Sequence, residues 1–286
     1  MTLKILLTDA TERLTQATSS KGEAQAMVRM IMEHLKGYNP ADCVIHSTDS
    51  VTPWLEHEVN MIVSRVEGGE PIQYVLGVAR FMGNDFKVTH DTLIPRPETA
   101  MLVDMITDRN SQRTDLRVLD IGTGSGCIAI SLAKALKFAQ ERATDISPAA
   151  LEVARQNAAA LKAGVTFALE DILSASTPVD AYDIIVSNPP YIAESEAETM
   201  ESHVKDQEPA SALFVPDSNP LLYYKAIAAY AIKALSPAGE LYLEINPLFA
   251  DELSAMLRES GFTEVELHPD FYGKTRFATA KKPANG

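Results

Sequence analysis

Asp120-Ile121-Gly122-Thr123-Gly124-Ser125-Gly126 connects a predicted strand, Arg117 to Ile121, to a predicted helix, Cys127 to Leu136. Its glycines let the chain turn tightly and let a ligand approach the backbone closely. The first turn of the helix carries a partial positive charge, which attracts an anionic group. The segment therefore predicts that a nucleotide-like ligand binds where this strand ends.

Strands and helices alternate from this segment to the end of the chain. Such alternation is typical of an α/β fold, in which helices cover both faces of a parallel sheet. The further strands are predicted at residues 142–144, 165–168, 182–187, 240–245, 264–268 and 275–281, and the main helices at 148–161, 221–235 and up to about 260.

The region before residue 70 has a different pattern. Apolar residues recur at helical spacing, as in Ala24, Met27, Ile31 and Leu35, and Thr52-Pro53 has the form of a helix start. Residues 70–92 contain two β-rich runs, 73–77 and 86–89, around Gly83-Asn84-Asp85, which predicts a β-hairpin. We therefore expect a helical domain at 1–69, a hairpin linker at 70–92, and a main domain at 93–286.

Composition excludes several classes of function. The net charge is −14, and the sequence shows no cluster of Lys or Arg residues that could form a basic surface. Direct nucleic-acid binding is therefore not expected. Cys43, Cys127 and the six histidines have no metal-ligand spacing. No segment resembles a signal peptide or could span a bilayer, so we expect a soluble, cytoplasmic protein without membrane contact.

Acidic residues near the ends of successive strands indicate which nucleotide binds. Asp145 lies 19 residues past Gly126, where a carboxylate can accept hydrogen bonds from both ribose hydroxyls. Asp171 beside Ile172 could receive an adenine amino group against an apolar wall. Asp120 would repel a pyrophosphate but suits an ammonium group, which favours S-adenosylmethionine over the alternative, an NAD cofactor.

Asn188-Pro189-Pro190-Tyr191 follows the apolar run 182–187. Prolines lack an N–H group, so the strand ends abruptly and nearby carbonyls are left unpaired at the edge where open α/β sheets bind ligands. An Asn amide, a Pro carbonyl and an aromatic face together could hold a planar group that carries an NH2. The alternative is a Pro-rich loop around a buried Tyr.

With both motifs in place, the chain resembles class I methyltransferases that act on an sp2 amino nitrogen. Its flanking motifs are similar to those of the bacterial release factor glutamine methyltransferases (PrmC/HemK family): residues 71–74, Phe81-Met82-Gly83, 93–99, Glu208-Pro209, and Asp270, Gly273 and Arg276. The resemblance covers nearly the whole chain. It departs from the family pattern at Ala100, Asn219-Pro220 and Asn246-Pro247, which concerns substrate docking more than the reaction.

This resemblance implies a Rossmann-like, seven-stranded, mostly parallel sheet that binds S-adenosylmethionine. It implies methyl transfer to the glutamine amide nitrogen in the Gly-Gly-Gln loop of peptide chain release factors. The implied catalytic residues are Asn188, Pro189, Pro190 and Tyr191, and Phe81 with the segment 96–99 would cover the cofactor. The candidate cofactor-binding residues are Asp120, Gly122, Thr123, Gly124, Ser125, Gly126, Asp145, Asp171, Ile172 and Asn188, with no metal.

Two other functions stay open at this point. A DNA adenine-N6 methyltransferase would need a target-recognition domain and a basic groove. A catalytically inactive S-adenosylmethionine-binding scaffold would not need Asn188 or Tyr191. The helical domain is expected to dock the release factor, although it could instead only stabilise the sheet.

Overall fold

The computed structural model describes residues 1–176, 181–199 and 207–284. The chain forms two compact units, one built on Met1–Val78 and the other on Ala79–Met200 and Glu208–Gly286. Each unit has a hydrophobic core of its own. The three-part division at residues 69 and 92 stays a prediction.

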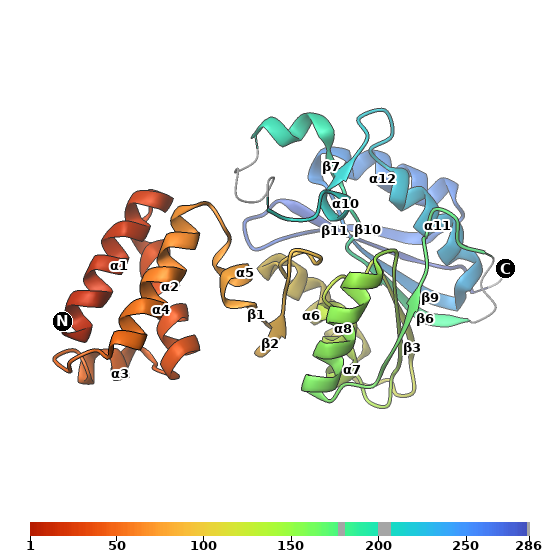
Figure 1. The fold of residues 1–286 in the computed structure, drawn as a ribbon. Coiled ribbons are helices and arrows are strands. Elements are labelled where there is room, and N and C mark those ends of the chain that lie inside the picture. Colours follow the sequence, from red (N-terminus) through yellow and green to blue (C-terminus); the bar gives the residue numbers. More distant parts are fainter. Residues whose placement is uncertain (177–180, 200–206, 285–286) are drawn as a thin grey trace. The chain divides into compact units, whose positions relative to one another are not determined.

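The first unit is helical, as expected, and appears in red to orange in Figure 1. Its helices are α1 (Leu3–Thr18), α2 (Lys21–Lys36), α3 (Pro40–Ile45), α4 (Pro53–Glu67) and α5 (Ile72–Leu76). The Thr52 hydroxyl accepts the Leu55 N–H at the start of α4, which is the predicted cap. The fully buried side chains include Leu6, Leu14, Ile31 and Met32 from α1 and α2. Packing between amphipathic helices therefore stabilises this unit.

The predicted strand at residues 73–77 is wrong, because this segment is helix α5. Ile72 and Leu76 lie one helical turn apart, and both are buried in the core of the first unit. Gly77, at φ +68°, ends the helix. The predicted hairpin exists, but its strands are β1 (Val78–Phe81) and β2 (Asn84–Lys87). Burial of two apolar side chains has overridden the β-propensity of the sequence between them.

The second unit contains the predicted seven-stranded, mostly parallel sheet. Its strand order is β10-β11-β9-β6-β3-β4-β5, and only β11 is antiparallel to its neighbours. Because β4 and β6 flank β3, the carboxyl ends of these three parallel strands meet at one edge, where open α/β sheets bind ligands. The bounds are β3 (Arg117–Ile121), β4 (Gln140–Asp145), β5 (Val165–Leu169), β6 (Tyr182–Ser187), β9 (Leu235–Glu244), β10 (Thr263–Pro269) and β11 (Thr275–Lys281).

Helices cover both faces of this sheet (Figure 1). Alternate residues of β3 supply the two cores: Val118 packs in one, and Leu119 and Ile121 pack in the other. The first core contains side chains of α6 (Pro97–Asn110), α7 (Cys127–Ala135) and α8 (Pro148–Leu161); the second contains those of α11 (Leu222–Ala234) and α12 (Ala250–Glu259). Short elements complete the unit: β7 (Ile192–Ala193), η1 (Glu194–Thr199), α10 (Ala210–Leu213), β8 (Phe214–Val215) and η2 (Pro247–Phe249).

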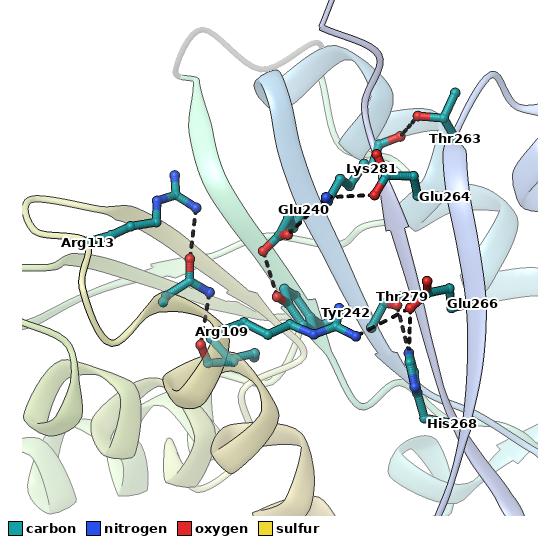
Figure 2. Close-up of polar contacts among 12 residues, drawn as sticks. Arg109, Arg113, Glu240, Tyr242, Thr263, Glu264, Glu266, His268, Thr279 and Lys281 are labelled. Carbon is teal, nitrogen blue, oxygen red and sulfur yellow. Dashed lines mark hydrogen bonds and ion pairs between the residues drawn. The ribbon is translucent and has the colours of Figure 1, made fainter.

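Charged side chains line the strands β9 to β11 on the side of α6 (Figure 2). Arg109 of α6 reaches Glu266 of β10 at 3.4 Å, and Lys281 reaches Glu264 at 2.7 Å. These side chains are partly exposed, so each pair contributes about 0–1 kcal/mol of stability. The position of β10 therefore depends mainly on its hydrogen-bonded ladder with β11.

Candidate active site

A cavity of about 300 Å³ opens at the carboxyl ends of β3, β4 and β6. Most of the predicted site residues line it: Gly122, Thr123, Gly124, Ser125, Asp145, Asp171, Ile172, Asn188, Pro189 and Pro190. The wall also contains Arg96 and Thr99 from the predicted cover segment. The glycine motif and the Asn-Pro-Pro motif, 62 residues apart between Gly126 and Asn188, therefore contribute to one cavity.

The glycine turn has the backbone conformation that its sequence predicts. Gly122, Gly124 and Gly126 have φ of +74°, +54° and +83°. A Cβ on Gly126 would lie 2.9 Å from Ile130 Cδ1, whereas a Cβ on Gly122 or Gly124 would meet nothing within 4 Å. Gly126 thus allows the start of α7 to pack closely against Ala154 of α8. Gly122 and Gly124 instead leave open space on the cavity side.

Asn157 holds this turn from behind, and the sequence analysis missed it. Its Nδ2 donates to the Ser125 carbonyl at 2.9 Å and to the Lys87 carbonyl at 2.9 Å, and its Oδ1 accepts the Lys87 N–H at 2.7 Å. The residue is buried inside α8. An Asn within an Ala-rich helix was the available signal, because Asn disfavours helix interiors unless its side chain is needed elsewhere.

Asp145 lies at the cavity with its carboxylate fixed by the backbone. One oxygen accepts the Gly124 N–H at 2.8 Å and the other accepts the Ser147 N–H at 2.9 Å. Burial raises the pKa of this carboxyl, and the backbone donors oppose that shift. Each carboxylate oxygen can accept a second bond, so both can receive a ribose hydroxyl.

Asp171 and Ile172 line the same cavity in a turn that follows β5. The Asp171 carboxylate accepts the Leu173 N–H at 2.9 Å, so it stabilises its own turn, and its remaining lone pairs are available to an amino group. Ile146 lines the cavity as well and is 61% exposed. Its position directly after Asp145 was the only signal in the sequence. Ile146 and Ile172 provide apolar surface suited to a planar base.

Asp120, like Gly126 at the other end of the motif, does not line the cavity, whereas the five residues between them do. Its carboxyl is fully buried; Oδ2 accepts the Thr123 hydroxyl at 2.7 Å, and Oδ1 has no partner among the described residues. Burial raises the pKa of Asp120 to about 7. The structure therefore places this acid under the turn, where it holds Thr123, and gives no direct route from its carboxyl to an ammonium group in the cavity.

The Asn-Pro-Pro segment is held against β3. The Ser187 hydroxyl donates to the Ile121 carbonyl at 2.7 Å, which joins the ends of β6 and β3. Tyr191 does not line the cavity with Asn188, Pro189 and Pro190. Its hydroxyl instead donates to Glu244 Oε1 at 3.1 Å, and burial raises its pKa. Its expected wall position is therefore taken by the prolines.

The predicted cover is only partly present at the cavity. Phe81 is buried at 3% exposure, packs edge-on against Phe86 and does not line the cavity, and its place over the cofactor stays a prediction. The Phe81 ring packs in the apolar core that also contains side chains of α6 and α7. Arg96 lines the cavity and pairs with the buried Glu208 at 2.5 Å, and Glu208 also accepts the Ile94 N–H. This ion pair fixes the cover segment.

The described residues contain no group of three or more His, Cys, Asp or Glu side chains placed to hold a metal ion. None of the helices in the described part of the chain combines the length and apolar character needed to cross a bilayer.

Comparisons with known proteins agree with this geometry. A family model for the PrmC N-terminal domain matches residues 6–77, and one for the Methyltransferase small domain matches residues 97–207. The release factor glutamine methyltransferase of Bacteroides thetaiotaomicron is 43% identical over 91% of this chain and 93% of its own length. That of Bordetella pertussis is 38% identical over 93% of this chain and 97% of its own.

A solved methyltransferase structure from Pyrococcus furiosus aligns with a TM-score of 0.53 at 17% identity, covering 77% of this chain and 97% of that chain. This likeness supports the methyltransferase fold. The sequence relatives decide the family, because their identity extends over nearly the full length of both chains. The chain belongs to the family of release factor glutamine methyltransferases.

Proposed function

We propose that the protein methylates the side-chain amide nitrogen (N5) of the glutamine in the Gly-Gly-Gln motif of peptide chain release factors, with S-adenosylmethionine as methyl donor. The observation that carries this proposal is the single cavity shared by the glycine turn and the Asn188-Pro189-Pro190 wall. Relatives of this chain carry the corresponding name. Release factors act on cytoplasmic ribosomes, so we place the enzyme in the cytoplasm.

The cavity residues suit this cofactor. Gly122 and Gly124 leave room for close approach to the backbone, and Asp145 can receive the ribose hydroxyls. Ile146 and Ile172 can cover the adenine, and Arg96 is the cation available for the carboxylate. The bound cofactor would supply an electrophilic methyl group on a positively charged sulfur.

The catalytic problem is the weak nucleophilicity of an amide nitrogen, whose lone pair is delocalised into the carbonyl. Asn188 Oδ1 and the Pro189 carbonyl would accept the two N–H bonds of the substrate amide and turn its lone pair towards the methyl group. Orientation of this kind can supply several kcal/mol of the barrier reduction, up to roughly 7–11 kcal/mol. The quaternised nitrogen then loses a proton to water, so no strong base is needed.

A radiolabelled methyl-transfer assay with release factor, DNA and ribosomal RNA side by side tests this proposal. We expect label in the release factor alone, and a loss of roughly 100-fold or more in turnover for Asn188→Ala, far larger than any change in its thermal stability. Transfer to DNA would favour the adenine-N6 alternative, and absence of any transfer would favour an inactive scaffold. Wild-type turnover by the variant would refute the mechanism.

We further propose that residues 1–69 dock the release factor and that residues 70–92 link them to the methyltransferase domain at 93–286. One glutamine side chain offers too little contact area for selective recognition of a large protein. The helical unit exposes large apolar side chains, with Val44 at 72%, Ile45 at 71% and Trp54 at 53% exposure.

Trp54→Glu should therefore raise the KM for whole release factor while leaving cofactor affinity and thermal stability unchanged. Gln25→Glu adds the same charge at an exposed position of α2 and serves as the control. If the helical unit only stabilises the sheet, both variants will keep the wild-type KM.

A further inference from the structure

We infer that Thr99 and Glu244 are positioning residues that determine which end of the Asn188 amide faces the substrate. This inference rests on the proposed function. Thr99 lies in the first turn of α6 and Glu244 is the last residue of β9. Both are buried, at 2% and 1% exposure, next to the cavity wall.

The three side chains form a continuous hydrogen-bonded series. Asn188 Nδ2 donates to Thr99 Oγ1 at 3.3 Å, and Thr99 Oγ1 donates to Glu244 Oε2 at 2.7 Å. The contacts join residues separated by 89 and 145 positions in the chain. Three elements of the sheet domain thus meet at this point: the segment after β6, the start of α6 and the end of β9.

The chemistry of each group gives this series a direction. An ionised carboxylate only accepts hydrogen bonds, and a hydroxyl has a single hydrogen to donate. Because the Thr99 hydrogen is directed to Glu244, Thr99 Oγ1 can only accept from Asn188. Asn188 must then present its NH2 group to Thr99, which leaves Oδ1 for the substrate in the cavity.

The remaining contacts of Glu244 maintain this direction. Its second oxygen, Oε1, accepts from the Tyr191 hydroxyl at 3.1 Å, and its backbone carbonyl accepts from the Tyr224 hydroxyl at 3.1 Å. Burial raises the pKa of the carboxyl, while the two side-chain donors and the positive charge of Arg276 favour its ionised form. Both carboxylate oxygens are thereby used as acceptors.

A reversed Asn188 amide would fail in catalysis. Its NH2 group would face the NH2 group of the substrate glutamine, donor against donor, and the substrate nitrogen would lose one of its two acceptors. The methyl-transfer step depends on that acceptor. Most of the proposed cofactor contacts, namely the glycine turn, Asp145, Ile146 and Ile172, lie outside this series. Loss of the Thr99 hydroxyl should therefore lower kcat by a larger factor than it weakens cofactor binding.

Thr99→Val removes the hydroxyl at nearly constant volume, and Thr99→Ser retains it as the matched control. With release factor as substrate, we expect Thr99→Val to lower kcat at least tenfold and Thr99→Ser to stay within threefold of wild type. Wild type assayed in parallel separates the two proposals: if wild type transfers no methyl group, the proposed function has failed. If wild type is active and Thr99→Val has wild-type kcat, only the present inference has failed.

A double-mutant cycle shows whether Thr99 acts through Asn188. In an Asn188→Ala background, measured under single-turnover conditions, Thr99→Val should change the rate less than twofold. A full tenfold loss in both backgrounds would show that Thr99 acts on something else and would overturn the inference. The same cycle with Glu244→Gln covers the case in which Thr99→Val does not fold: loss of rate confined to the Asn188 background supports the inference, and equal loss in both backgrounds refutes it.

Discussion

Gly126→Ala should unfold much more readily than wild type, because Gly126 combines an unfavourable φ with close neighbours. A left-handed backbone costs an L-residue roughly 1–2 kcal/mol. The new Cβ would lie 2.9 Å from Ile130 Cδ1 and 3.2 Å from Ala154 Cβ. The end of the Ile130 side chain can move, but Ala154 is fixed in α8, and overpacking of this kind costs about 1–3 kcal/mol. The expected loss of unfolding free energy is therefore about 2–5 kcal/mol.

Gly124→Ala is the matched comparison, since it also has a positive φ but no neighbour within 4 Å of the added Cβ. Its unfolding free energy should fall by only about 1–2 kcal/mol. Its methyl group would project into the open space at the cavity, so its affinity for S-adenosylmethionine should fall strongly. Urea unfolding and calorimetric titration on both variants measure the two effects. Equal loss of stability in the two variants would refute the distinction between a packing glycine and a ligand-contact glycine.

Two further predictions concern the acids of the site. Asp145→Ala should weaken S-adenosylmethionine binding by roughly 1–3 kcal/mol in calorimetry, because the ribose hydroxyls lose their acceptors, and unchanged affinity would remove Asp145 from the site. Asp120 has a pKa of about 7 in the folded protein and an ordinary pKa near 3.9 when unfolded, so its stabilising contribution is complete below about pH 3.9 and is lost as the pH rises to 7. The difference in unfolding free energy between Asp120→Asn and wild type should therefore increase in favour of the variant by roughly 2 kcal/mol between pH 5 and pH 7. Urea unfolding at both pH values measures it, and a difference that does not change with pH would contradict the raised pKa of Asp120.

The elements predicted with correct bounds are those marked by local signals. β3 ends before Gly122, β6 ends before Asn188-Pro189, and α8 begins at the Ser147-Pro148 cap. Pro71 and Gly77 mark the ends of the segment 73–77, but such markers suit a strand as well as a helix. Its five-residue helix depends on burial of Ile72 and Leu76 against helices distant in sequence, which local propensity cannot predict.

The same distinction applies to the site. The residues found from the sequence, Thr99 among them, belong to contiguous motifs, whereas Asn157 and Glu244 were missed because they act through contacts between distant segments. The face of β3 on which Asp120 lies could have been predicted from the sequence. Side chains alternate along a strand, so Asp120 shares the face of Val118, which packs in the core below α7, and not the face of Leu119.

The charges of the cavity indicate whether electrostatics or substrate orientation accelerates the methyl transfer. Four acids line it, namely Asp91, Asp145, Glu170 and Asp171, and Arg96 is the only Lys or Arg among the described lining residues. A negative wall stabilises the sulfonium cofactor before reaction, and this charge disappears as the methyl group leaves. Such a field lowers the free energy of the ground state more than that of the transition state, so it strengthens binding without accelerating the transfer. The acceleration must then come from orientation of the substrate nitrogen, which makes the direction of the Asn188 amide the sensitive feature of this site.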